Sequence, residues 1–207
     1  MSHQIIDHRS AMKRARQDHQ KLERREAILA AGLALLDELP FQEITMTRIA
    51  ERAGVVKGTL YLYFATREEL FLELLGEQLH DWFWDQESLA GNLPRASRLD
   101  AAARQIGASV RQRPVLRGLL GVLDSHLLHN VPEPAVRAFQ EELRRRAHAL
   151  GTLWERALPF LRPGQGFAFL VRTMALVTGL QGRFADPELL TESLRLLLLG
   201  LREANRG

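Results

Sequence analysis

Residues 45–67 read TMTRIAERAGVVKGTLYLYFATR. This stretch predicts two short helices joined by a tight turn. Thr45 can cap the first helix, because its hydroxyl can accept hydrogen bonds from backbone N–H groups at the helix start. Gly54 follows that helix at a turn, where a positive φ is free of steric cost only for glycine. With Ile49 and Ala50 on the inner face and Leu60 returning to the core, the pattern predicts a helix-turn-helix.

The second of these helices, predicted over about 57–64, has an exposed surface suited to nucleic acid. Hydroxyl and ammonium groups there can donate to phosphates, and their carbons can touch thymine methyls. A glycine on that surface leaves room for close approach to a base edge. The alternative is an ordinary helical hairpin whose tyrosines cover core. The positions concerned are Lys57, Gly58, Thr59, Tyr61 and Tyr63.

Charge is distributed unevenly along the 207 residues. Residues 1–67 hold 11 basic and 8 acidic side chains, whereas residues 68–207 hold 17 of each. A cationic excess in the first third favours a polyanionic partner through counterion release. A solvated helix face is the alternative. The chain has no cysteine, which excludes a disulfide framework, a thiol nucleophile and a thiolate metal site.

The rest of the chain predicts an all-α fold, because apolar residues recur at helical spacing and strand signals are almost absent. Prolines stand at the starts or stops of these segments, where the helix tolerates them. Thr66 and Glu69 have the spacing of a capping box at the start of one helix. The predicted helices run over about 20–38, 66–88, 95–112, 114–129, 133–158, 165–183 and 187–204.

The last two predicted helices are apolar nearly all round. A helix of that kind must be covered on all sides. We therefore expect one face to pack on the domain and the other on a second copy, giving a homodimer through a four-helix interface. A fully internal helix pair is the alternative.

No apolar run approaches the roughly 18 residues of a membrane span, and no signal peptide is visible. We therefore expect no membrane partner and a cytoplasmic location.

From Arg25 to about Leu75 the sequence resembles the tetracycline-repressor (TetR) family of bacterial transcription regulators. The string IAERAGVVKGTLYLYF and the following TREELFLELL carry the resemblance. It implies an amino-terminal three-helix helix-turn-helix domain and a carboxyl-terminal helical domain for ligand binding and dimerisation. The expected division is a basic flexible arm over 1–19, a DNA-binding domain over 20–66 and the second domain over 67–207. Val56 and Arg67 depart from the usual family residues.

The resemblance also implies roles in binding a palindromic operator in double-stranded DNA. Thr45 and Arg48 would contact phosphates, and Arg67 would hold a phosphate from the start of the following helix. Lys57, Gly58, Thr59, Tyr61 and Tyr63 would lie in or beside the major groove. The basic arm could reach the backbone or the minor groove.

In this family the carboxyl-terminal domain usually binds a small effector, here expected to be hydrophobic or aromatic. Core packing is the alternative role for each candidate residue. A buried Arg172 would favour an anionic group on the ligand. The candidates are Phe71, Leu75, Gln78 and Trp82, which share one helical stripe, and His126, Phe139, Trp154, Arg172 and Met174.

His126 and His129 lie three apart with Asp124 nearby, a weak pattern for zinc or nickel. We predict no metal and no cofactor.

We predict a ligand-responsive DNA-binding repressor. The alternatives are a related regulator without a ligand pocket, acting as an activator or under a partner's control, and an enzyme on a helical scaffold. No hydrolase elbow, zinc-protease motif, phosphate loop or dinucleotide fingerprint is present, so no catalytic residue is predicted.

Overall fold

The computed structural model describes residues 2–94, 97–180 and 187–206. It divides into two compact units, Met1–Leu70 and Phe71–Gly207. Those described residues are helical or lie in turns, with no strand, as the all-α prediction requires. Nowhere in the described part of the chain is a helix long and apolar enough to cross a membrane.

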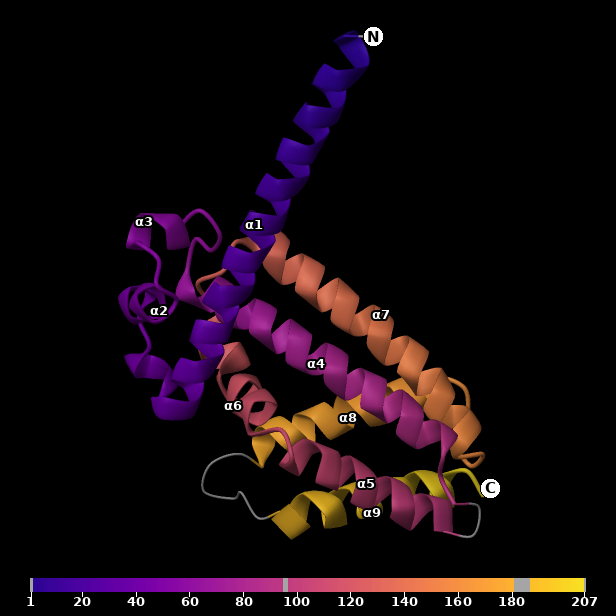
Figure 1. Cartoon of the computed structure of the whole chain (residues 1–207). Coiled ribbons are helices and arrows are strands. Elements are labelled where there is room, and N and C mark those ends of the chain that lie inside the picture. Colours follow the sequence, from indigo (N-terminus) through magenta and orange to yellow (C-terminus); the bar gives the residue numbers. More distant parts are fainter. Residues whose placement is uncertain (1, 95–96, 181–186, 207) are drawn as a thin grey trace. The chain divides into compact units, whose positions relative to one another are not determined.

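The described part of the first unit contains three α-helices, a 3-10 turn and the start of a fourth α-helix, near the indigo end of the colour scale in Figure 1. The buried face of its long first helix begins at Ile28 and continues through Leu29 and Leu35, while Leu22, nearer the amino end of the helix, is exposed. The elements are α1 (Ser2–Glu38), the 3-10 turn η1 (Phe41–Glu43), α2 (Met46–Arg52), α3 (Lys57–Leu60) and α4, which starts at Arg67.

The turn between α2 and α3 has the predicted geometry. Thr45 is the N-cap of α2, and its hydroxyl accepts a hydrogen bond from the Arg48 N–H at 3.3 Å. Gly54 has φ +66°, the left-handed region that a side chain disfavours. The N–H of Val55 then donates to the Ala50 carbonyl at 3.0 Å, which closes the turn. The helix-turn-helix is therefore confirmed.

A capped helix start follows at Thr66. Its hydroxyl accepts from the Glu69 N–H at 3.1 Å, as in the predicted capping box. The Glu69 carboxylate accepts from the Ala65 N–H at 2.7 Å. In a standard capping box it would accept from the N–H of the N-cap residue, Thr66, which is one residue later. Both interactions fix the start of α4.

The second unit holds the rest of α4, which ends at Gly91, and a set of further helices. Two of its helix pairs lie side by side in Figure 1, α5 with α9 and α7 with α8. The elements are α5 (Arg98–Arg111), α6 (Pro114–Val122), the π-helical turn η3 (Leu123–Leu127), α7 (Glu133–Ala157), α8 (Gln165–Gly179) and α9 (Pro187–Ala204).

Glycines allow α7 and α8 to approach closely. A Cβ on Gly151 of α7 would lie 2.5 Å from the Phe167 backbone nitrogen of α8, and a Cβ on Gly166 would overlap the Gly151 carbonyl. Next to this crossing, the His148 and Phe167 rings stack at 3.9 Å between centroids. Only residues without a side chain fit at the two crossing positions.

Several helix boundaries differ from the prediction: the second helix of the motif, predicted over about 57–64, ends at Leu60, and the helix predicted over 66–88 ends at Gly91. The first helix begins at Ser2 instead of about 20, since no proline or glycine interrupts residues 2–19. The helix predicted over 114–129 ends at Val122 and continues as the π turn. The predicted start at 95 and end at 183 lie outside the described residues.

Candidate nucleic-acid interface

Two buried side chains anchor the segment formed by α3 and the turn after it. Leu60 and Phe64 are almost fully buried in the first unit. The Tyr61 N–H donates to the Lys57 carbonyl at 3.3 Å and the Phe64 N–H to the Leu60 carbonyl at 3.1 Å, so the chain keeps a helical course past Leu60. The opposite side of this segment faces solvent. We call residues 56–63 the recognition segment.

The predicted DNA contacts in this segment are exposed to different degrees. Lys57 and Gly58 are exposed, and Tyr61 is 48% exposed. Thr59 and Tyr63 are half-buried, so Tyr63 is less outward than the sequence suggested. Tyr63 follows Leu60 by three residues, and residues at that spacing share a helix face.

Leu62 is the residue that the sequence prediction missed. Its side chain is 80% exposed, and that of Val56 is 74% exposed. Leu62 stands four residues after Gly58, on the same helix face. That spacing was available from the sequence, but no role was predicted for Leu62.

Thr45 and Arg48 lie together at the start of α2, both exposed. Besides the cap described above, Arg48 Nη1 donates to the Glu43 carbonyl at 3.1 Å. The same nitrogen lies 3.9 Å from the Glu43 carboxylate. The phosphate contacts predicted for Thr45 and Arg48 stay predictions.

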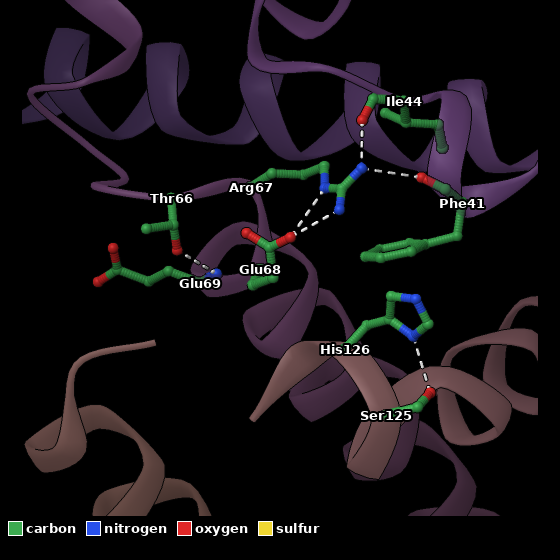
Figure 2. Close-up of polar contacts among 8 residues, drawn as sticks. All are labelled: Phe41, Ile44, Thr66, Arg67, Glu68, Glu69, Ser125 and His126. Carbon is green, nitrogen blue, oxygen red and sulfur yellow. Dashed lines mark hydrogen bonds and ion pairs between the residues drawn. The ribbon is translucent and has the colours of Figure 1, made fainter. Parts of the chain in front are cut away.

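Arg67 makes an extensive network inside the first unit, shown in Figure 2. Nη1 donates to the carbonyls of Phe41 at 3.1 Å and Ile44 at 2.7 Å. Nε and Nη2 donate to Glu68 Oε1 at 3.1 and 2.6 Å. The guanidinium carbon also lies 4.4 Å from the centre of the Phe41 ring. Arg67 therefore joins the start of α4 to the loop that precedes α2.

This network bears on the phosphate contact predicted for Arg67. The hydrogen bonds to two carbonyls and Glu68 use four of its five N–H groups. The side chain is 20% exposed, and Glu68 is buried. The structure therefore gives Arg67 a positioning role, and its phosphate contact stays a prediction.

Two further cations of the first unit pair with neighbouring groups. The Arg52 guanidinium donates to both carboxylate oxygens of Glu38, linking the end of α2 to the end of α1. The hydrogen bond with Arg52 lowers the pKa of Glu38 from its ordinary value of 4.5. Arg25 lies 5.3 Å from the centre of the Phe64 ring, so it covers one of the two anchors of the recognition segment.

The nine residues predicted to bind a ligand do not share one environment. Phe71, Leu75, Trp82 and Trp154 are buried, whereas Gln78, His126, Phe139 and Met174 are half-buried. Arg172 is exposed. A buried Arg172 would have favoured an anionic group on the ligand, and the structure does not give that indication. Trp82 Nε1 donates to the Ser109 hydroxyl at 3.1 Å, and Gln86 Nε2 donates to the same hydroxyl at 2.9 Å.

Among the pockets formed by described residues of the second unit are two of about 310 Å³ each. None of the nine predicted ligand residues lines either pocket. Ser109, the partner of Trp82, lines the second. The first is lined by Glu87, Ala90, Gly91, Leu93, Arg98, Leu153, Arg156 and Ala157, and the second by Asp85, Ser88, Leu89, Gln105, Ala108, Ser109, Gln112 and Arg113.

Five buried side-chain polar atoms in the described part of this unit have no hydrogen-bond partner. Two of them, the Trp154 Nε1 donor and the Gln86 Oε1 acceptor, lie on side chains with no exposed surface. Such an atom costs on the order of 1–3 kcal/mol unless water or a ligand satisfies it.

The suspected metal pair lies in and just after η3. His126 is half-buried, His129 is exposed, and the Ser125 hydroxyl lies 2.7 Å from His126 Nδ1 (Figure 2). Within the described ranges, no three histidine, aspartate or glutamate side chains gather as metal ligands would.

Comparisons with known proteins agree with this architecture. Residues 28–74 match the family model described as bacterial regulatory proteins, tetR family, and residues 76–196 match the tetracyclin repressor-like carboxyl-terminal domain. The HTH-type transcriptional repressor KstR of Mycolicibacterium smegmatis is 34% identical over 96 residues, which cover 45% of this chain and 47% of that protein. The chain therefore matches about half the length of KstR.

Two more relatives extend the similarity. The fatty acid metabolism regulator protein of Bacillus subtilis is 24% identical over 152 residues, covering 62% of this chain and 78% of that protein. The crystal structure of Thermus thermophilus FadR, a TetR-family repressor in complex with lauroyl-CoA, superposes with a TM-score of 0.60 at 23% identity, covering 84% of this chain and 93% of that one. The chain belongs to the TetR family of bacterial regulatory proteins.

Proposed function

We propose that the protein is a DNA-binding transcriptional repressor whose homodimer binds a palindromic operator and releases it when a small apolar ligand binds. The observation that carries the proposal is the recognition segment. Its outer residues Lys57, Tyr61 and Leu62 are exposed, while Leu60 and Phe64 hold it on the first unit. TetR-family proteins are regulators and typically not enzymes, which favours this function over the enzyme alternative.

In this proposal residues 20–66 read the operator, and residues 1–19 add a basic segment that reaches the DNA backbone. Residues 67–207 bind the ligand and the second copy. The half-sites are about 34–36 Å apart or a multiple of this, because each copy places one recognition segment in the major groove. The protein works in the cytoplasm, where bacterial DNA lies.

Exposed apolar side chains on the last two helices support the homodimer. Val171 on α8 is 50% exposed and Leu196 on α9 is 59% exposed. The two helices also contact each other within the unit. A second copy packed over these exposed side chains removes apolar surface from water, which favours association.

The unpartnered Trp154 and Gln86 atoms support a ligand inside the second unit. A ligand that offers an acceptor to Trp154 Nε1 or a donor to Gln86 Oε1 satisfies that atom, and the surrounding core favours an apolar body. Lauroyl-CoA is the first probe, because a structural relative is described in complex with it. Ligand binding then shifts the population between two dimer states.

The DNA-binding function is tested by selecting duplexes from a random pool and titrating the preferred sequence. We expect a palindrome bound by two copies. Lys57→Ala weakens this binding, because a positive charge beside the groove is lost. The matched control is Lys21→Ala, a change at another exposed lysine of the first unit. Equal effects of the two variants would contradict the proposed interface.

The ligand function is tested separately by thermal unfolding. Lauroyl-CoA at saturating concentration raises the melting temperature, because it binds the native state and not the unfolded chain. Coenzyme A and lauric acid, tested alone, separate the two parts of the molecule. No shift with any of the three, together with unchanged operator binding, excludes acyl-CoA as the ligand.

A further inference from the structure

Gly58 and Leu62 form the outermost edge of the recognition segment. A helix turns by about 100° per residue, so the positions two before and two after Leu60 lie roughly opposite its side chain. Leu60 points into the core with no exposed surface. Leu62 is correspondingly the most exposed large apolar side chain of the segment.

The fold itself does not require either residue. A Cβ added at Gly58 meets no atom within 4 Å, and its φ lies outside the positive range, so an alanine would fit. Leu62 likewise gains little from packing, because most of its surface is in water. A bare backbone next to a protruding leucine suits a partner that approaches closely and offers an apolar group.

The partner that meets both conditions is a thymine in the major groove. Its 5-methyl group is the one apolar group on the major-groove edges of the four bases. Exposed Lys57 on the same segment supplies charge complementarity to the neighbouring phosphates. We propose that Leu62 is a specificity-determining residue that packs against a thymine methyl in each half-site, and that Gly58 allows the backbone to come close to the base. This inference rests on the proposed operator binding.

The test replaces each thymine of the selected operator, one at a time, with deoxyuridine. This removes only the methyl group and leaves base pairing and charge unchanged. For the native protein we expect one position in each half-site where uracil weakens binding about fourfold, the value for one buried carbon. Leu62→Ala abolishes the preference for thymine at that position and leaves the other positions as they were.

The matched control is Leu22→Ala, which truncates another exposed leucine of the first unit and keeps the full thymine preference. Leu62→Met, which keeps an apolar side chain of similar length, keeps part of the preference. Because Leu62 is exposed, both of its variants fold, and equal melting temperatures verify this.

Two outcomes overturn the inference in distinguishable ways. If the native protein selects no duplex, the proposed function fails and Leu62 with it. If it selects an operator but uracil costs the same for the native protein and Leu62→Ala, only the role of Leu62 fails. In that case the exposed leucine serves a protein partner or none.

Discussion

Gly54 and Gly58 lie four residues apart in the same motif and are glycine for different reasons. Gly54 needs its positive φ of +66°, so Gly54→Ala strains the turn and lowers stability by about 1–2 kcal/mol. Gly58 has open space around it and an ordinary backbone. Gly58→Ala therefore leaves the free energy of unfolding unchanged or raises it by up to ~1 kcal/mol, so the melting temperature does not fall. The same change weakens operator binding, because the new methyl group stands between the backbone and the DNA.

Thermal unfolding and operator titration of both variants check this pair of expectations. A loss of stability in Gly58→Ala equal to that in Gly54→Ala would show that the fold, and not the DNA, requires the second glycine.

Arg67 illustrates how a charged residue near a DNA-binding surface can serve the fold. Arg67→Lys keeps the positive charge. A lysine ammonium group, however, lacks the planar set of donors with which the guanidinium bonds two carbonyls and Glu68 at once. We expect a loss of about 2 kcal/mol in stability, since the carbonyls of Phe41 and Ile44 lose their donor. Urea unfolding measures this. Unchanged stability with weakened operator binding would instead support the phosphate contact.

Sequence patterns predicted the motif better than its surface. Thr45, Gly54 and Leu60 take the positions expected, because a cap, a positive φ and an anchor depend on near neighbours in sequence. Tyr63 is less exposed than predicted, and Leu62, for which no role was predicted, is exposed, because exposure depends on how the whole segment packs on the rest of the first unit. The hydrogen bonds of Arg67 within the first unit could not be predicted, since the carbonyl groups that accept them are 23 and 26 residues away in the sequence.

Among the elements, α7 and α8 depend on their glycine crossing. Gly166→Ala places a methyl group against the Gly151 carbonyl and forces the helices apart. We expect a loss of about 1–3 kcal/mol, the usual cost of overpacking. Gly118→Ala in α6 is the control, because its new Cβ meets nothing within 4 Å. Calorimetry of the two variants compares them, and an equal effect would contradict the close crossing.

The link between α1 and α2 through Glu38 and Arg52 gives a dependence on pH. Because the pKa of Glu38 is lowered in the folded state, its contribution is present above about the ordinary value of 4.5 and disappears as pH falls through the lowered pKa. Glu38→Gln therefore melts below the native protein at pH 7, and the gap narrows as the pH falls through the lowered pKa of Glu38. A gap that does not change with pH would exclude the ion pair as its cause.

Element boundaries show the limits of sequence patterns in another way. Prolines marked the starts of α6 and α9 correctly, because proline is disfavoured inside a helix. The π turn after Val122 carries no such mark. Its π-helical course shows in the bond from the Leu128 N–H to the carbonyl of Leu123, five residues earlier, at 3.1 Å.

For the whole molecule, DNA recognition and dimerisation are proposed to act together. Val171→Glu or Leu196→Glu places a charge at an exposed apolar position of α8 or α9 and makes the protein monomeric. Operator affinity then falls by at least a hundredfold, because two half-sites are no longer bound as one unit. Trp84→Glu, a change at an exposed tryptophan of α4, is the control. Light scattering measures the mass of the protein in solution. If both variants remain dimers, the dimer interface does not include Val171 or Leu196.

The central claim is that the recognition segment reads duplex sequence. Its most direct measurement is an anisotropy titration of the native protein and Lys57→Ala against the selected palindrome and a scrambled duplex of equal length and composition. The account predicts that the native protein binds the palindrome at least 1,000-fold more tightly, as specific regulators do, and that Lys57→Ala weakens binding to both duplexes. Equal affinity of the native protein for the two duplexes would contradict it.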